Sequence, residues 1–167
     1  MKARSVQLRQ EVFKADAWKI VEWLDDHEVI KYLNEGQNAV NSIVQVIQRV
    51  NMPILTHLFN QNGSFFIIME DKQPIGFLRL VPKGKEAEMV VVIGEKKKWG
   101  MGLGKNAILQ GLRHAFFEWR MEEVIAKINF KNERSMKVFK SVGFKPEKEL
   151  MKEMQYSISA REFLKIE

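Results

Sequence analysis

The chain has 167 residues, of which 46% are hydrophobic and 29% are charged, a balance typical of one globular domain with a substantial core. It contains no cysteine, which excludes a disulfide framework, a thiol nucleophile and a thiolate metal site. The formal charge of +6 is dispersed without a recognisable nucleic-acid-binding motif, and no apolar run opens the sequence, so we expect a cytoplasmic protein with neither a nucleic-acid nor a membrane partner.

An acidic segment follows the first predicted strand and helix. The strand covers residues 6–9 and the helix residues 15–24, where apolar residues recur at helical spacing and Asp16 is placed to cap the first turn. Residues 25–35 then hold the densest acidic cluster of this basic chain: Asp25, Asp26, Glu28 and Glu35. One of these carboxylates could receive a cationic amine, although a solvated helix end would give the same pattern.

A second helix and three strands are expected next. The helix covers residues 41–58, with Asn41 or Ser42 as its cap and an interruption near Pro53. The first two strands form a hairpin, because a short turn separates them. The three strands cover residues 65–69, 75–81 and 86–93.

A glycine-rich turn follows the third of these strands and opens an amphipathic helix. Residues 90–93 are β-branched without interruption, as in a strand covered on both faces. Gly100, Gly102 and Gly104 let a ligand approach the backbone, and the helix start adds unpaired N–H groups and the positive end of its dipole. This combination predicts a cradle for a phosphate or pyrophosphate. The adjoining lysines 96–98 either assist it or form a solvated face.

Two familiar nucleotide loops do not fit the spacing of these glycines. A Walker loop would need glycine in place of Trp99 and a hydroxyl in place of Asn106, so a magnesium ligand is missing. A dinucleotide-binding G-x-G-x-x-G pattern would need glycine in place of Lys105. The sequence therefore disfavours nucleotide hydrolysis and dinucleotide binding.

The C-terminal part of the chain predicts alternating strands and a helix. Gly143 ends the helix, and a short polar tail follows from Ser159. Asn132 can cap this helix, and Ser135 can be simply a small packed residue. The expected strand, helix and two final strands cover residues 124–129, 132–142, 144–149 and 154–158.

Three stretches of the chain resemble the GNAT superfamily of N-acetyltransferases. WGMGLG resembles its pyrophosphate loop, Gln/Arg-x-x-Gly-x-Gly/Ala, with Trp99 at the Gln/Arg position and Gly102 and Gly104 at the small positions. This variant is similar to the branch with ribosomal-protein N-terminal acetyltransferases and aminoglycoside 6′-N-acetyltransferases, as is the acidic segment, WL-x-D-x-E-V-x-x-Y. The pattern N-x-x-S-x-x-x-Y/L-x-x-x-G-F is matched by Asn132, Ser135, Phe139, Gly143 and Phe144.

The resemblance implies both a fold and an activity for residues 1–167 as a single domain. The fold is α/β (α+β), the GNAT fold: a mixed, mostly antiparallel sheet of about seven strands, flanked by four helices and splayed between strands 4 and 5. The activity is acetyl transfer from acetyl-CoA, without a metal, to a primary amine that attacks directly in a ternary complex. The acceptor would be a protein N-terminus or a small cationic amine, and a homodimer is compatible with the family. A non-catalytic acyl-CoA-binding or sensing module is the alternative.

The resemblance also implies roles for particular residues. Glu88 would be the general base, acting through water, although it could equally face solvent or a lysine, and the backbone amide near Val91 would stabilise the oxyanion. The acceptor would lie against Asp26, Glu28, Tyr32 and Glu35. The cofactor would contact Val91, Val92, Ile93, Lys98, Trp99, Gly100, Met101, Gly102, Leu103, Gly104, Lys105, Asn132, Ser135 and Phe139.

Phe139 departs from the family pattern, where a tyrosine is usually assigned as the acid that protonates the leaving thiolate. Phenylalanine has no ionisable proton. The sequence leaves three alternatives: another group donates, water donates, or the thiolate leaves unaided. Tyr32 and Tyr156 are the only tyrosines in the chain and are therefore the candidates for another donor.

Overall fold

A mixed sheet of seven strands runs through the computed structural model, which describes residues 5–33 and 36–166. The strands lie in the order β1-β2-β3-β4-β5-β7-β6, and every neighbouring pair is antiparallel except β4 and β5. This arrangement confirms the predicted mostly antiparallel sheet. The strands are β1 (Gln7–Arg9), β2 (Ser64–Glu70), β3 (Gln73–Lys83), β4 (Glu86–Ile93), β5 (Glu123–Asn129), β6 (Lys145–Glu149) and β7 (Glu153–Ser159).

Six α-helices accompany the sheet in the described residues, rather than the four that were predicted, together with a 3-10 turn, η1, and a π-helical turn, η2. Among these described helices, none has both the length and the apolar character needed to cross a bilayer. The helical segments are α1 (Lys14–Leu24), α2 (Gly36–Arg49), α3 (Thr56–Phe59), η1 (Lys96–Lys98), α4 (Leu103–Arg113), η2 (His114–Glu118), α5 (Glu133–Val142) and α6 (Ala160–Ile166).

The predicted interruption of the helix over residues 41–58 near Pro53 is confirmed, whereas its predicted start and caps are wrong. The segment contains the end of α2 and, separately, α3. Asn41 and Ser42 lie inside α2, which begins at Gly36, so neither is its cap. Pro53 lies between the two helices, where its missing N–H and fixed φ do not allow helical hydrogen bonding to continue.

The predicted polar tail is wrong, because a helix, α6, follows Ser159. The Ser159 hydroxyl accepts a hydrogen bond from the N–H of Glu162 at 3.1 Å, and the Glu162 carboxylate accepts one from the N–H of Ser159 at 3.0 Å. These reciprocal bonds form a capping box, which satisfies the free donors of the first turn of α6. Asp16 lies in the first turn of α1 rather than at its cap position, Phe13, and its carboxylate accepts a hydrogen bond from the N–H of Phe13 at 2.9 Å.

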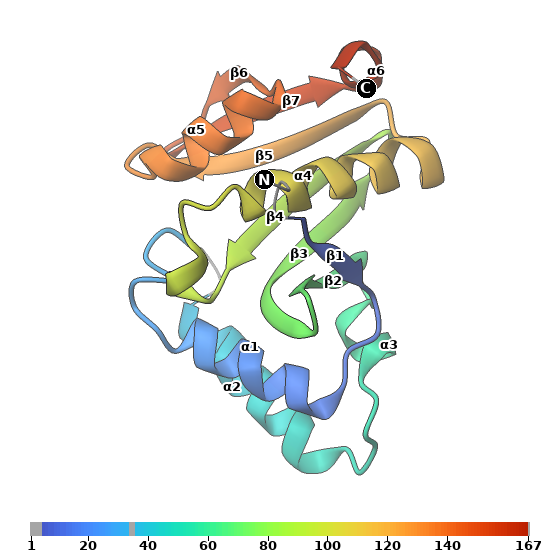
Figure 1. Cartoon of the computed structure of the whole chain (residues 1–167), viewed down its shortest axis with the longest axis vertical. Helices are drawn as coiled ribbons and strands as arrows, with labels where there is room; N and C mark the ends of the chain where they lie inside the picture. The colour runs from blue at the N-terminus through green and yellow to red at the C-terminus, as the bar shows by residue number, and fades with distance from the viewer. Residues whose placement is uncertain (1–4, 34–35, 167) are drawn as a thin grey trace.

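The two faces of the sheet pack against different helices (Figure 1). In β3 and β4, Leu78 and Met89 belong to the core that includes the buried residues of α4. Phe77 and Val92 belong to the core that includes Ile20 of α1. The alternation arises because successive strand residues point to opposite faces.

The sheet divides between β4 and β5, as predicted. These two strands pair only at Glu86–Glu123, Ala87–Val124 and Glu88–Ile125. In contrast, the β3–β4 ladder continues to Ile93 and the β5–β7 ladder to Asn129. The remaining parts of β4 and β5 therefore diverge, and each leaves one edge without a strand partner.

Candidate active site

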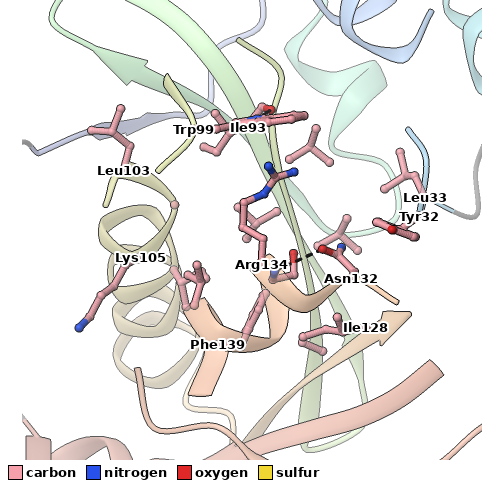
Figure 2. A pocket seen from close by; sticks show the side chains of 18 of the residues that line it. Tyr32, Leu33, Ile93, Trp99, Leu103, Lys105, Ile128, Asn132, Arg134 and Phe139 are labelled. Carbon is pink, nitrogen blue, oxygen red and sulfur yellow. Dashed lines mark hydrogen bonds between the residues drawn. The ribbon is translucent and has the colours of Figure 1, made fainter. Parts of the chain in front are cut away.

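A cavity of about 230 Å³ occupies the divergence between β4 and β5. The glycine-rich turn and the start of α4 border it on one side, and Tyr32 and Leu33 lie on the opposite side (Figure 2). Of the predicted cofactor residues, only Met101 is not among its lining residues. The main lining segments are residues 28–29, 32–33, 89–93, 98–100, 102–105, 126–129, 132, 134–135 and 138–139.

The glycine-rich turn has the conformation of an anion cradle. Gly100 and Gly102 both have a φ of +78°, in the left-handed region that favours glycine. A Cβ added at either position would meet no atom within 4 Å, so open space lies in front of the turn. Gly102 caps α4, and the first intrahelical bond runs from the N–H of Asn106 to the carbonyl of Gly102 at 3.2 Å. The preceding N–H groups of the first turn have no carbonyl partner in the helix.

Trp99 connects this turn to the end of β4 and to α5, which border the cavity on two sides. Its indole N–H donates to the carbonyl of Ile93 at the end of β4, at 2.8 Å. The guanidinium of Arg134, from the first turn of α5, lies 3.7 Å from the centre of the indole ring, a close cation–π contact (Figure 2). Sequence reasoning missed Arg134, although it lies inside the Asn132–Ser135 motif. The contact holds a cation beside the glycine-rich turn.

The lysines before the turn are engaged by carboxylates. Lys98 forms an ion pair with Glu70 at 2.6 Å, and Lys96 forms one with Asp26 at 2.9 Å. The hydrogen bond from Lys96 lowers the pKa of Asp26. Of the two alternatives for this lysine cluster, assistance to the phosphate cradle or a solvated face, these pairs favour neither, because Lys96 and Lys98 are both engaged by carboxylates. In Figure 2 the side chain of Lys105 also points away from the cavity.

The predicted acceptor residues divide into three groups. Glu28 and Tyr32 line the cavity, and Glu28 is the only carboxylate among the described lining residues. Asp26 does not line it, and Lys96 forms ion pairs with both Asp26, at 2.9 Å, and Glu28, at 3.9 Å. Glu35 lies outside the described residues. One carboxylate and one phenol therefore face the cavity from the segment that follows α1.

Helix α5 forms one wall of the cavity and carries the motif that begins at Asn132. Asn132 caps α5 by accepting a hydrogen bond from the N–H of Ser135 at 3.3 Å, and both residues line the cavity. Phe139 also lines it and packs edge-on against Phe144, with ring centroids 5.0 Å apart. Tyr156 is buried and is not among the lining residues, so Tyr32 is the tyrosine that reaches the described cavity wall.

Glu88 has surroundings that do not favour a general base. It is not among the lining residues, and its carboxylate contacts Lys83 at 2.7 Å and Lys127 at 3.3 Å. Burial raises the pKa of Glu88, but the two lysines more than offset this and leave it below its ordinary value. A general base at neutral pH needs a raised pKa instead.

Residues 7–145 match the family described as the acetyltransferase (GNAT) domain. The chain belongs to the GNAT family. It is therefore an N-acetyltransferase of that family, which confirms the predicted enzyme class. Uncharacterized N-acetyltransferase p20 from Bacillus licheniformis is 26% identical over 137 residues, which are 79% of this chain and 75% of that protein.

Solved structures confirm the GNAT fold. A GNAT-family acetyltransferase from Bacillus anthracis has a TM-score of 0.77 at 20% identity, covering 97% of this chain and 99% of that one. Spermidine N-acetyltransferase from Vibrio cholerae, in complex with CoA and spermine, has a TM-score of 0.79 at 15% identity, covering 96% and 98%. Aminoglycoside acetyltransferase AAC(6′)-Ib, in complex with coenzyme A, has a TM-score of 0.78 at 14% identity, with the same coverage.

Proposed function

We propose that this GNAT protein transfers the acetyl group of acetyl-CoA to a primary amine while both substrates are bound. The observation that carries the proposal is the cavity that passes between β4 and β5. An anion cradle lies at one end of it, and a carboxylate and a phenol lie at the other. The two substrates would therefore approach each other from opposite ends.

The residues of the cradle fit the phosphates of acetyl-CoA. The N–H groups at the start of α4 and its dipole favour an anion, and Arg134 adds a positive charge beside them. The pantetheine arm would follow the free edge of β4 at residues 91–93, because alternate N–H and C=O groups there have no partner in β5. Asn132 and Phe139 would form the facing wall.

Acetyl-CoA supplies a thioester, and the ammonium must first lose one proton to solvent water to become a neutral amine. The amine nitrogen then forms a bond to the thioester carbonyl carbon and the C–S bond breaks. The nitrogen loses a second proton to water, and the leaving thiolate takes up one proton from water. Glu28 would hold the incoming ammonium close to the reacting carbon. A backbone N–H near Val91 would stabilise the negative oxygen. We assign no general acid, because Phe139 cannot donate a proton.

A small primary amine or a protein N-terminus remains the acceptor in this proposal. The spermidine acetyltransferase of Vibrio cholerae was solved with spermine, and AAC(6′)-Ib with kanamycin. These relatives support an amine as the acceptor, whereas the shape and charge of this chain's own cavities define which amine.

Calorimetry with CoA and a thiol-release assay with acetyl-CoA test the proposal together. We expect CoA to bind, and an amine to accelerate release of the free thiol. Arg134→Ala should weaken CoA binding about tenfold, because it removes the cation beside the cradle, whereas Arg161→Ala, on the exposed surface of α6, should leave it unchanged. Absence of CoA binding, or equal effects of the two variants, would contradict this assignment.

A further inference from the structure

The segment that follows α1, residues 25–33, forms one wall of the cavity between β4 and β5. It contributes Glu28 and Tyr32, the one carboxylate and the one phenol among the described lining residues. The segment forms neither a helix nor a strand. The positions of Glu28 and Tyr32 therefore depend on individual hydrogen bonds and ion pairs rather than on a regular element.

Asp26 organises the backbone of this segment. Its carboxylate accepts a hydrogen bond from the N–H of Glu28 at 3.0 Å, and its carbonyl accepts one from the N–H of Ile30 at 3.1 Å. A carboxylate that bonds the N–H two residues further on forms an Asx turn, which fixes the backbone between them. The side chain of Asp26 therefore sets how the chain presents Glu28, although Asp26 does not itself line the cavity.

Lys96 anchors this Asx turn to the segment that leads into the glycine-rich turn. It lies in η1, and its ammonium contacts Asp26 at 2.9 Å and Glu28 at 3.9 Å. The closer partner, Asp26, has a side chain that is 30% exposed, against 71% for Glu28, so the pair with Asp26 is less screened by solvent. The hydrogen bond to Asp26 also raises the pKa of Lys96, and both groups are charged at neutral pH.

A second link connects the residue before η1 to α1. The indole N–H of Trp23 donates to the carboxylate of Glu95 at 3.1 Å, and Lys19 forms an ion pair with the same carboxylate at 3.4 Å. Glu95 and Lys96 therefore contact α1 and the segment that follows it, respectively. A shift of residues 25–33 relative to the glycine-rich turn would break the pair between Lys96 and Asp26.

We infer that Asp26 and Lys96 are positioning residues for the acceptor amine. Their ion pair holds the Asx turn in the arrangement that presents Glu28 and Tyr32 to the cavity. Neither Asp26 nor Lys96 is a lining residue, so they act through the segment rather than by contact with the acceptor. This inference rests on the proposed function, in which Glu28 receives the ammonium, and it gives Asp26 a different role from the direct contact expected from the sequence.

Steady-state kinetics of thiol release from acetyl-CoA test the inference, with n-butylamine, spermidine and L-alaninamide as acceptors. Asp26→Ala should raise the KM of the most active amine about tenfold, because it removes both the ion pair and the hydrogen bond to the N–H of Glu28. Lys96→Met leaves that hydrogen bond in place and should raise the KM about threefold, and Lys96→Arg should restore it. The KM of acetyl-CoA should not change in these variants.

Lys145→Met is the matched control, because it removes an ion pair of similar length, 3.0 Å to Glu162, at the strand β6. It should change neither KM. If Asp26→Ala and Lys96→Met lower only kcat and thermal stability, the pair has a purely structural role and the inference is overturned. A lower acceptor KM in Lys96→Met would also overturn it, because Lys96 would then be a competitor of the ammonium for Glu28.

Hydrogen–deuterium exchange gives a readout that needs no acceptor. Asp26→Ala and Lys96→Met should speed exchange at residues 26–33 of the unliganded protein, whereas Lys145→Met should not. Unchanged exchange in the first two variants would overturn the inference and leave the proposed acetyl transfer in place. Absence of thiol release by the wild-type protein with every amine would overturn the proposed function and this inference with it.

Discussion

Gly102 and Gly84 adopt similar left-handed backbone conformations in different surroundings. Gly102 has a φ of +78° and lines the cavity before α4, whereas Gly84 has a φ of +65° in the turn between β3 and β4. A Cβ added at either glycine would meet no atom within 4 Å. The two positions therefore separate the cost of a strained backbone from the cost of blocking a ligand.

We expect Gly102→Val to weaken CoA binding at least tenfold, because the new side chain would stand in front of the free N–H groups of α4. Gly84→Val carries a similar backbone strain, about 1–2 kcal/mol, and should leave the affinity unchanged. Calorimetry with CoA measures both, after thermal unfolding has verified that each variant is folded. Equal losses of affinity would mean that strain, rather than obstruction of the cradle, is responsible.

At the scale of the elements, Glu88 joins three strands at the point where the sheet divides. It lies at the last paired position of β4 and contacts Lys83 of β3 and Lys127 of β5. Its folded-state pKa is below the ordinary value despite the opposing effect of burial. Its ionised form therefore stabilises the fold above the ordinary carboxyl pKa, and this contribution is lost as the pH falls through the lowered pKa.

Glu88→Gln should lower the free energy of unfolding at pH 7 by about 1 kcal/mol, and the difference from wild type should vanish in acid. Denaturant unfolding at several pH values measures it, with Glu149→Gln, on the exposed strand β6, as the control. The rate of acetyl transfer should change little. A loss of about 100-fold or more in kcat would restore Glu88 as the general base.

The sequence predicted the elements that carry local signals and missed those that depend on distant contacts. The β-branched strand, the glycine-rich turn and Asn132 are local, and the cavity includes all of them. The Ser159–Glu162 capping box was also readable, and was overlooked. In contrast, the contact of Arg134 with Trp99 joins residues on two different elements, so no spacing rule could indicate it.

Close packing across the fold was equally invisible in the sequence. A Cβ at Gly94 would lie 2.1 Å from the ring of Trp23, so this glycine is required by a side chain from α1 rather than by a ligand. The same tryptophan donates to Glu95 at 3.1 Å. The ion pair of Lys96 with Asp26 also links the segment before the glycine-rich turn to the segment after α1. The segment before the glycine-rich turn is therefore held by α1 and by the segment that follows it.

At the scale of the whole molecule, the protein is two half-sheets joined by a short parallel ladder. Strands β1–β4 form one half and β5–β7 the other, and they pair at three positions (Figure 1). A cofactor between the diverging strands would contact both halves. Its binding would therefore add an interaction across the narrowest part of the fold.

We expect CoA to slow hydrogen exchange at residues 89–93 and 126–129 together, because it would shield both free edges. Exchange within the β1–β2 pair should change less, since this pair is distant from the cavity. Hydrogen–deuterium exchange with mass spectrometry, with and without CoA, resolves these segments. Protection of one diverging strand alone would contradict a ligand that spans the two halves.

The divergence of β4 and β5 also determines which strand edges of this sheet could pair with a strand from another chain. An unpaired strand edge can add a strand from another chain, which is a common route to aggregation. Here the outer edges are the three-residue β1 and the charged β6, whereas the apolar run at residues 90–93 has its free edge inside the molecule. CoA bound in this gap would cover the free edge of β4 and so protect the protein from aggregation. We therefore expect protein stored without CoA to precipitate sooner than protein stored with CoA.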